Sequence, residues 1–294
     1  MKAFDNNLQE SFFKHITIVG LGLIGGSWAL ALRSRGFGGV IDGCDRPSVL
    51  EAALAAGAID RGFEDLSQAI AAADLIILAA PVGAIVKMLP QLTAAPRTAL
   101  VTDTGSTKAL ICRQAAAMFG DGPLFLGGHP LAGKEFPGLA HASATLFQGA
   151  RYVITPLSSE HLADPRVMAF EHWVALAGAR VLHSTPPEHD HAVAYLSHLP
   201  QLVSTALASS LFESVEIHEL EFGASGFRDM TRLAESSYEL WRDICASNAE
   251  NIGAALERMI EKLKGIRASL AEPALEREFR QASALRHKRP PDQP

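Results

Sequence analysis

Cysteine is scarce in this sequence, and its scarcity excludes two classes of protein. Only three cysteines occur among 294 residues, far apart along the chain and never as a CxxC pair. Isolated thiols build neither a disulfide framework nor a zinc site, and they are typical of a reducing, cytoplasmic compartment. We therefore predict a cytoplasmic protein with no disulfide-stabilised fold and no metal centre.

Basic clusters and long apolar runs are also rare. The net charge is −6 and the one basic block is Arg286-His287-Lys288-Arg289, so nucleic acid is not expected as a partner. Residues 1–14 hold no apolar core of signal length, and the most apolar stretch, 71–86, is interrupted by Asp74 and Pro81. The sequence thus predicts no membrane segment.

What remains is the composition of a folded, core-forming chain. Apolar residues make up 48% of the sequence and charged residues 20%. This balance is typical of globular proteins. The length of 294 residues predicts one large or two medium domains.

A glycine-rich turn near the N-terminus is the first positive signal. Ile16, Ile18 and Val19 have the apolar, β-branched character of a buried parallel strand, and a run of helix formers covers 28–33. Between them lies Gly20-Leu21-Gly22-Leu23-Ile24-Gly25-Gly26, which has the GxGxxG spacing of a dinucleotide-binding turn. A glycine-rich turn without a ligand is the alternative.

The glycines of this turn have separate predicted roles. Gly20 permits the tight turn, Gly22 lets the backbone approach a pyrophosphate, and Gly25 lets the helix pack close to the strand. The start of the helix offers free N–H groups and a partial positive charge to an anion. The predicted cofactor contacts of the turn are Gly20, Gly22, Leu23, Ile24 and Gly25.

A second predicted strand, 40–44, ends at Asp45. A carboxylate there can accept hydrogen bonds from the adenosine ribose, which favours NAD, but Arg46 beside it could hold the 2′-phosphate of NADP. Ala80 and Pro81 follow another predicted strand and complete the predicted cofactor site.

Strand and helix signals alternate from residue 15 to residue 183. This alternation predicts a doubly wound, Rossmann-type parallel sheet with helices on both faces and ligands at the carboxyl ends of the strands. Residues 1–14 are predicted to be a frayed or loosely docked leader, and 60–65 a loop. Further strands are predicted over 75–79, 99–103, 124–126, 152–155 and 180–183, and helices over 47–56, 66–73, from 82 to near 90, from the 103–108 turn to 119–120, and 165–177.

The pattern changes near residue 185, where strand signals end. We predict a dinucleotide-binding domain over 1–185 and an all-helical domain over 186–294 with a disordered tail from 286. A short helical arm seldom has enough core by itself, so a homodimer is expected. Helices are predicted over 189–214, 226–234 and 237–270, with a buried face formed by Leu196, Leu199, Leu202, Val203, Leu207 and Leu211.

His129 is the main catalytic candidate. It lies in GGHPLAGKE, residues 127–135, where the flanking glycines and proline predict a tight loop after a strand. An imidazole near a nicotinamide can accept a hydroxyl proton while hydride leaves the same carbon. A histidine that ties the loop down by hydrogen bonds is the alternative.

Two further candidates lie on the turn DTGSTK. Ser106 could bond to the substrate hydroxyl or to the catalytic histidine, or it could be a plain helix N-cap. Lys108 could neutralise charge on the substrate or the cofactor, or face solvent.

The helical half adds three groups of polar residues. The run His189-Asp190-His191 favours a helix-start carboxylate with a structural histidine over a metal site, since no third ligand is evident. Arg228, Asp229 and Arg232 lie on GFRDMTRL, where an arginine can grip a carboxylate or form a surface salt bridge. Trp241 is expected in the core or at an interface.

These motifs together resemble one family, the prephenate and arogenate dehydrogenases of tyrosine biosynthesis. The resemblance extends from about residue 15 to 252 and is most specific in GGHPLAG, SHLP and the TR…WRDI segment. It implies a Rossmann domain followed by a helical dimerisation domain, and oxidative decarboxylation with NAD(P)+. Its matching stretches are IVGLGLIGGSWALAL, AAPV, DTGSTK, GGHPLAGKE, HDHAVAYLSHLP and GFRDMTRLAESSYELWRDI.

The resemblance also implies roles for individual residues. His129 accepts a hydrogen bond from the ring 4-hydroxyl of the substrate, and Ser106 orients both. Arg232 binds a substrate carboxylate. The other implied pocket residues are Glu135 near the mouth, His189 near the nicotinamide, and Asp229 and Trp241 on the supporting wall.

One departure from the family concerns the substrate. Many relatives have histidine after SHLP, where this chain has Gln201, so the choice between a keto-acid and an amino-acid side chain stays open. The segment 156–159 is not acidic, and in relatives an acid near there favours arogenate, so we expect prephenate. Inhibition by tyrosine at the active site is a further possibility.

Two other functions compete with this one. Dehydrogenases of the β-hydroxyacid or pyrroline-reductase kind also pair a Rossmann domain with helices, but they carry a catalytic lysine on a helix or lack the GGHP loop. An NAD-sensing scaffold would keep the glycine turn and have no use for His129, Ser106 and Arg232 together.

Overall fold

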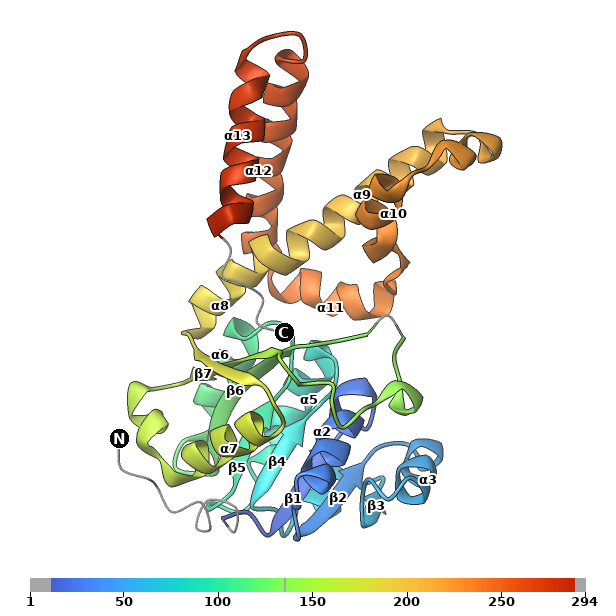
Figure 1. The fold of residues 1–294 in the computed structure, drawn as a ribbon. Helices are drawn as coiled ribbons and strands as arrows, with labels where there is room; N and C mark the ends of the chain where they lie inside the picture. The colour runs from blue at the N-terminus through green and yellow to red at the C-terminus, as the bar shows by residue number, and fades with distance from the viewer. Residues whose placement is uncertain (1–11, 135, 289–294) are drawn as a thin grey trace. The chain divides into compact units, whose positions relative to one another are not determined.

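The computed structural model describes residues 12–134 and 136–288, which form two compact units (Figure 1). The first unit contains the described residues up to 192 together with 235–247, and the second contains 193–234 and the described residues from 248 to 288. The chain therefore passes between the units three times. The division of the sequence near residue 185 stays a prediction.

The first unit is built on one eight-stranded sheet with the order β3-β2-β1-β4-β5-β6-β7-β8. All neighbouring strands are parallel except β6 and β7, which are antiparallel. The sheet is therefore mostly parallel, and the prediction of a parallel sheet is confirmed except at this one pair. The strands are β1 (His15–Val19), β2 (Val40–Cys44), β3 (Arg61–Phe63), β4 (Leu75–Leu78), β5 (Leu100–Asp103), β6 (Leu124–Leu131), β7 (Arg151–Pro156) and β8 (Arg180–His183).

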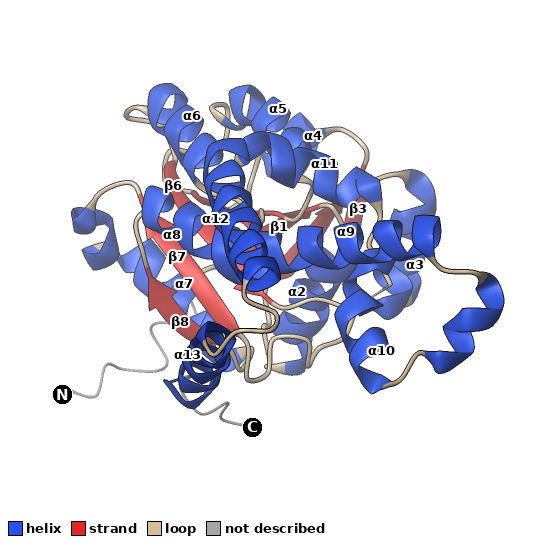
Figure 2. Cartoon of the chain, turned by 90° about the horizontal axis from the view of Figure 1, so that it is seen from above, coloured by secondary structure: helices blue, strands red, loops and turns tan. Residues whose placement is uncertain are grey.

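Side chains of each central strand alternate between two apolar clusters, one on each face of the sheet. Leu75 and Ile77 of β4 belong to one cluster, and Ile76 and Leu78 belong to the other. This is the period of two that a pleated strand imposes. Figure 2 shows α5 and α6 on one side of the strands and α2 and α7 on the other. The buried, doubly covered sheet is the one that the sequence predicts.

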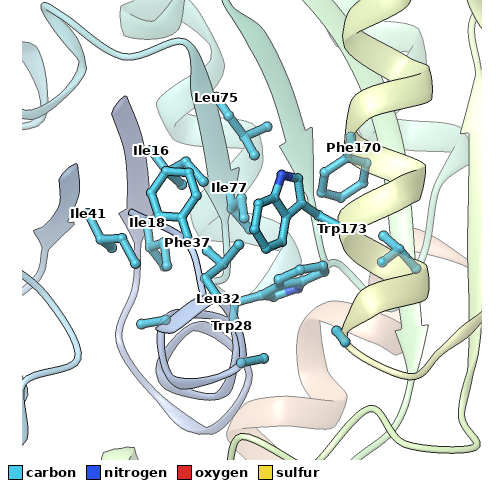
Figure 3. Close-up of a cluster of buried hydrophobic side chains, with 14 of the residues drawn as sticks. Ile16, Ile18, Trp28, Leu32, Phe37, Ile41, Leu75, Ile77, Phe170 and Trp173 are labelled. Atoms are coloured by element: carbon cyan, nitrogen blue, oxygen red, sulfur yellow. The ribbon is translucent and has the colours of Figure 1, made fainter. Parts of the chain in front are cut away.

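Aromatic rings fill the cluster between the sheet, α2 and α7 (Figure 3). Trp28 of α2 lies 5.7 Å from Phe170 of α7 between ring centroids, and Phe37 lies 5.4 Å from Trp173. Phe13 is 2% exposed and belongs to the same cluster. The prediction of a loosely docked leader is therefore wrong at Phe13, because burying a phenylalanine stabilises this segment by about 1.5–3 kcal/mol. Residues 1–11 lie outside the described part of the chain.

The helices of the first unit follow the predicted order. Pro47 begins α3 at a position where its missing N–H costs nothing, and Gly57 takes φ +64° just after the helix. The α-helices are α2 (Leu23–Ser34), α3 (Pro47–Ala55), α4 (Leu66–Ile70), α5 (Val82–Leu92), α6 (Ala109–Phe119), α7 (Pro165–Leu176), α8 (Pro186–Val193) and α11 (Tyr238–Ser247), with 3-10 turns η1 (Leu139–His141) and η2 (Ser159–Ala163).

The second unit is helical, as predicted, but its helices are shorter than predicted. Pro200 lacks the N–H that would bond four residues back, and the chain opens into the π-helical turn η3 just before it. Asn248, at φ −127° and ψ 27°, separates α11 from α12. The elements are η3 (Ala194–His198), α9 (Leu199–Ser214), η4 (Ile217–Phe222), α10 (Ser225–Thr231), η5 (Arg232–Glu235), α12 (Ala249–Ala268) and α13 (Ala274–Lys288).

Three other predictions are corrected. The loop over 60–65 contains the strand β3, which pairs with β2. Residues 286–288 are the last residues of α13 and not part of a disordered tail, while 289–294 lie outside the described residues. Leu196 is 81% exposed, and the other five apolar residues of the predicted buried face are half-buried within this single chain.

Candidate active site

The predicted cofactor and catalytic residues of the first unit gather at one edge of its sheet. Strands β1, β2, β4, β5 and β6 run parallel, so their carboxyl ends share that edge. The glycine turn follows β1, Asp45 follows β2, and Ala80 and Pro81 follow β4. Ser106 follows β5, and His129 lies near the end of β6. Ligands of open α/β sheets bind at this edge.

The glycine turn has the close approaches that its sequence predicts. Gly20 has φ +88°, and a β-carbon there would lie 2.4 Å from the carbonyl oxygen of Ala79 at the end of β4. A β-carbon on Gly25 would lie 1.8 Å from the carbonyl oxygen of Gly20. Any side chain at these positions would push the turn away from the sheet or from α2.

Gly22 is different, because a β-carbon there would meet nothing within 4 Å. Gly22 is also the N-cap of α2, and no side chain among the described residues caps that helix start. The N–H groups at Leu23, Ile24 and Gly25 precede the first intrahelical hydrogen bond, so they are available to an anion. The turn therefore fits the pyrophosphate of a dinucleotide.

Asp45 supports the same turn from the neighbouring strand. Its Oδ2 accepts a hydrogen bond from the Leu21 N–H at 2.7 Å, and its Oδ1 accepts one from the Arg46 N–H at 2.7 Å. The Arg46 side chain is 85% exposed. The carboxylate thus holds the turn closed, and its roles in ribose binding and in the choice between NAD and NADP stay predictions.

His129 lies on strand β6 and not on a tight loop, which corrects the prediction. Residues 127–131 continue β6 beyond its pairing with β5 and form an antiparallel ladder with β7, in which His129 faces Val153. The glycines that suggested a loop instead allow close packing against neighbouring strands. A β-carbon on Gly128 would lie 2.7 Å from the Asp103 carbonyl oxygen and 3.0 Å from the Tyr152 ring.

The side chain of His129 belongs to a hydrogen-bonded chain of three residues. His129 Nδ1 lies 2.8 Å from His189 Nε2, and His189 Nδ1 lies 2.8 Å from Asp190 Oδ1. His189 and Asp190 are 3% and 1% exposed. Asp190 also accepts hydrogen bonds from the N–H groups of Lys108 at 2.6 Å and Ala109 at 2.8 Å.

Lys108 forms a buried ion pair next to these three hydrogen-bonded residues. Its ammonium group contacts the Asp103 carboxylate and donates a hydrogen bond to the Gly128 carbonyl at 2.8 Å, and both charged side chains are fully buried. Asp103 also accepts hydrogen bonds from the N–H groups of Gly105 and Gly128. Lys108 therefore does not face solvent, and that alternative is wrong.

Ser106 is half-buried on the segment between β5 and α6. It is not a helix N-cap, because α6 begins at Ala109 and the carboxylate that receives its first N–H groups is Asp190. The predicted role of Ser106 toward His129 stays a prediction.

Helix α11 carries Trp241 and belongs to the first unit. Its Asp243 accepts a hydrogen bond from the Gly83 N–H in the first turn of α5 at 3.1 Å. Its Ser247 is 2.7 Å from Thr107, between their hydroxyl oxygens. These contacts fix α11 to segments that follow β4 and β5. They therefore also fix the position of the half-buried Trp241 on this helix.

Other predicted substrate residues lie in the second unit or outside the described chain. Asp229 on α10 and Arg232 at the start of η5 are exposed. Gln201 is 5% exposed and donates a hydrogen bond to the Leu233 carbonyl at 2.6 Å, so it fixes the start of η5. Glu135 lies outside the described residues.

Two of the three cysteines are buried. Burial raises the pKa of both the Cys44 and Cys112 thiols to about 11, so neither forms the reactive thiolate at neutral pH. Among the described residues, no group of histidine, cysteine and acidic side chains is arranged to hold a metal ion, and no helix is long and apolar enough to cross a membrane.

Two family models cover most of the chain. The prephenate dehydrogenase nucleotide-binding domain matches residues 28–183, and the prephenate dehydrogenase dimerization domain matches residues 185–282.

Similar proteins agree with these matches. Prephenate dehydrogenase of Bacillus subtilis is 33% identical over 270 residues, which cover 90% of this chain and 72% of that relative. Cyclohexadienyl dehydrogenase of Zymomonas mobilis is 31% identical over 264 residues, which cover 88% of this chain and 89% of that relative. The crystal structure of prephenate dehydrogenase from A. aeolicus with hydroxyphenyl propionate and NAD+ has a TM-score of 0.84 at 28% identity, covering 98% of this chain and 99% of that one.

A doubly wound sheet of this strand order, with an anion-accepting helix start at its carboxyl edge, defines a dinucleotide-binding fold. The matches narrow that class. This chain belongs to the prephenate dehydrogenase family. The fold class, the kind of cofactor and the family predicted from the sequence are thereby confirmed.

Sequence reasoning did not find the residues that support His129. Asp190 was considered as a helix-start carboxylate or, less favoured, as part of a metal site, and Lys108 as a surface or ligand-binding charge. In the structure Asp190 accepts hydrogen bonds from N–H groups at the start of α6. The Lys108 side chain links β5 to β6, because its ammonium group contacts the Asp103 carboxylate and the Gly128 carbonyl. No local pattern could have paired residues that lie 82 positions apart.

Proposed function

We propose that this chain catalyses the oxidative decarboxylation of prephenate to 4-hydroxyphenylpyruvate with NAD+ as hydride acceptor. The observation that carries the proposal is the position of His129, at the same sheet edge as the glycine turn, with its ring held by His189 at 2.8 Å. The names of the B. subtilis and A. aeolicus relatives support it. The enzyme would act in tyrosine biosynthesis in the cytoplasm.

His129 is the proposed proton acceptor. When bound, NAD+ supplies the acceptor for the hydride that leaves the ring carbon bearing the hydroxyl group. His129 takes the hydroxyl proton as that carbon becomes a carbonyl, and it returns the proton to the oxygen once the ring carboxylate has left as CO2. Ser106 orients the hydroxyl and the imidazole. Because aromatisation makes the reaction strongly downhill, the protein's main task is orientation.

The proposed substrate contacts follow the family resemblance. Arg232 binds a substrate carboxylate with its planar guanidinium, which matches the two oxygens of a carboxylate. The remaining proposed pocket residues are His189, Gln201, Glu135, Asp229 and Trp241.

We also propose that the chain acts as a homodimer. The match to a dimerization domain supports this, and so do the large apolar side chains that the second unit leaves exposed. Phe212, Ile217 and Phe222 are 91%, 86% and 86% exposed within the single chain. Apolar surface of this kind is typical of a subunit interface.

A single assay tests the reaction. The purified chain is mixed with NAD+ or NADP+ and with prephenate or arogenate, and the absorbance of the reduced cofactor is followed, with and without tyrosine. We expect the highest kcat/KM for prephenate with NAD+, and inhibition by tyrosine that prephenate overcomes. Absence of cofactor reduction with both substrates would refute the proposal.

Arogenate is the second candidate substrate. The Z. mobilis relative is named a cyclohexadienyl dehydrogenase, which supports a broader specificity. Gln201 is neutral, so it supplies neither a cation nor an anion to tell a keto group from an ammonium group. Equal kcat/KM values for the two substrates in the same assay would establish dual specificity.

A further inference from the structure

We propose that His189 and Asp190 are positioning residues that fix the tautomer of His129, so that its Nδ1 carries the proton and its Nε2 carries the lone pair. The inference rests on the proposed function, because it concerns the base of that reaction. It goes beyond that function by assigning each ring nitrogen a role.

The direction of the hydrogen bonds follows from the Asp190 carboxylate, the last of the three hydrogen-bonded residues. An ionised carboxylate only accepts hydrogen bonds, so the 2.8 Å contact with Asp190 requires the proton of His189 to lie on Nδ1. The Nε2 of a neutral His189 is then an acceptor. The 2.8 Å contact between that atom and His129 Nδ1 is therefore donated by His129.

Asp190 is held in this orientation by the start of α6. Its Oδ1 accepts the Lys108 N–H at 2.6 Å and its Oδ2 accepts the Ala109 N–H at 2.8 Å. Two N–H donors and the positive end of the helix dipole stabilise a carboxylate charge at this point. Because each oxygen accepts a hydrogen bond from a backbone N–H, the side chain cannot rotate without losing a hydrogen bond.

The same short segment also holds the strand that carries His129. The ammonium group of Lys108 donates to the Gly128 carbonyl at 2.8 Å, and Asp103 accepts the Gly128 N–H. Lys108 thus fixes the peptide before His129 through its side chain, and it fixes Asp190 through its backbone. Lys108 therefore holds both the strand that carries His129 and the carboxylate that orients its ring.

This arrangement has two consequences for catalysis. The His129 tautomer with its lone pair on Nε2 is ready to accept a proton there without first losing one. When His129 becomes imidazolium, the charge is shared along the hydrogen bonds toward Asp190. In a Ser-His-Asp triad, the change that gives the histidine the wrong tautomer lowers kcat about 10⁴-fold.

Two substitutions of His189 separate tautomer control from simple packing. His189→Leu removes the acceptor of the His129 Nδ1–H. His189→Gln places an amide oxygen where Nε2 lies, so that the acceptor is retained. The matched control is His183→Gln, since His183 pairs with Glu171 on the surface at 2.7 Å. Far-UV circular dichroism verifies that each variant is folded.

The decisive measurement is nuclear magnetic resonance of the full chain labelled with ¹⁵N in its histidine rings, at about pH 8, above the ordinary histidine pKa of about 6.5. The His129 signals are those that disappear in His129→Asn. We expect His129 to carry its proton on Nδ1 in the wild-type chain and in the His189→Gln and His183→Gln variants. We expect His189→Leu to shift His129 toward Nε2–H.

The kinetic expectation follows the same order. With prephenate and NAD+, His189→Leu should lower kcat about 10–100-fold, part of the usual contribution of a general base. His189→Gln should recover most of kcat, and His183→Gln should equal the wild type.

Several outcomes overturn the proposal. A wild-type His129 with its proton on Nε2 refutes it directly, even if His189→Leu does not fold. An unchanged tautomer in His189→Leu also refutes it, whatever happens to kcat. A wild-type chain that shows Nδ1–H but oxidises neither prephenate nor arogenate refutes the proposed function and leaves the tautomer assignment standing.

Discussion

A proton acceptor is effective when its lone pair is available before the reaction starts. His129 has a partner that fixes its ring at Nδ1, and that partner is fixed in turn by a buried carboxylate. Preorganisation of this kind lowers the cost of reaching the transition state. The first prediction therefore concerns the removal of this single ring.

His129→Asn should lower kcat by about 10²–10⁴-fold, the usual contribution of a general base. The KM for prephenate should stay within a few-fold, since substrate binding is assigned mainly to Arg232. Steady-state reduction of NAD+ measures both constants. His183→Asn, on the surface, is the control, and wild-type kcat in His129→Asn would contradict the assignment.

The second prediction at this scale concerns the choice of cofactor. Asp45→Asn keeps an oxygen for the Leu21 N–H but removes the negative charge. The KM for NAD+ should rise about tenfold, because a hydrogen bond to a charged group contributes about 1.5–3 kcal/mol. The KM for NADP+ should fall, since Arg46 then faces a 2′-phosphate without the repulsion of Asp45.

Initial rates with each cofactor give the two KM values for Asp45→Asn. The control is Asp121→Asn, which changes an exposed aspartate in the turn after α6. If the ratio of the two KM values did not change in Asp45→Asn, the ribose role of Asp45 would be wrong.

Single residues could be predicted where their chemistry is local. The glycine turn follows from its spacing, and His129 follows from the GGHP motif, to which the family resemblance adds a role. The hydrogen bond from the Leu21 N–H to Asp45 was not predicted. Lys108 and Asp103 could not be placed, since a buried lysine and an exposed lysine look alike in a sequence. Their burial depends on β6 passing beside β5.

At the scale of elements, the buried strands were the most predictable part of the fold. The strand over 180–183 has the predicted bounds, and β4 differs by one residue, because short apolar runs have few other stable states in an α/β chain. The extension of β6 through 127–131 was missed. Its glycines suggest a loop, and only the antiparallel partner β7 makes it a strand.

Helix α7 supplies a prediction about stability and pH. Asp164 caps this helix by accepting the Arg166 N–H at 2.8 Å, and it also accepts hydrogen bonds from the Arg166 guanidinium. These hydrogen bonds lower the pKa of the Asp164 carboxyl below its ordinary value. A lowered pKa means that the folded state favours the ionised form.

Asp164→Ala should therefore reduce the free energy of unfolding by about 1 kcal/mol at pH 7, the usual value of an N-cap. The contribution is present above the ordinary carboxyl pKa of 3.8 and is lost as the pH falls through the lowered value. Urea unfolding at pH 7 and below about pH 3 measures this, since the loss begins only below the ordinary carboxyl pKa. Glu160→Ala, on the neighbouring turn η2, is the control, and an equal loss for both variants would contradict the prediction.

At the scale of the whole molecule, the two compact units differ in how they bury apolar side chains. The first unit encloses two apolar clusters around its sheet. The second unit leaves large apolar side chains exposed along α9, η4, α12 and α13, among them Phe212, Phe222 and Phe279. The apolar spacing of this region predicted a buried face. The sequence alone could not show what covers that face.

The proposed homodimer would cover these side chains with a second copy of the chain. Light scattering after size exclusion should give a mass near twice 31.4 kDa. The double variant Phe212→Asp with Phe222→Asp should weaken the dimer by tenfold or more, because truncating a buried aromatic anchor at an interface costs about 2 kcal/mol or more. Met118→Asp, at an exposed apolar residue of the first unit, should leave the dimer intact. A monomeric wild type, or a double variant as dimeric as the wild type, would show that these side chains serve another purpose.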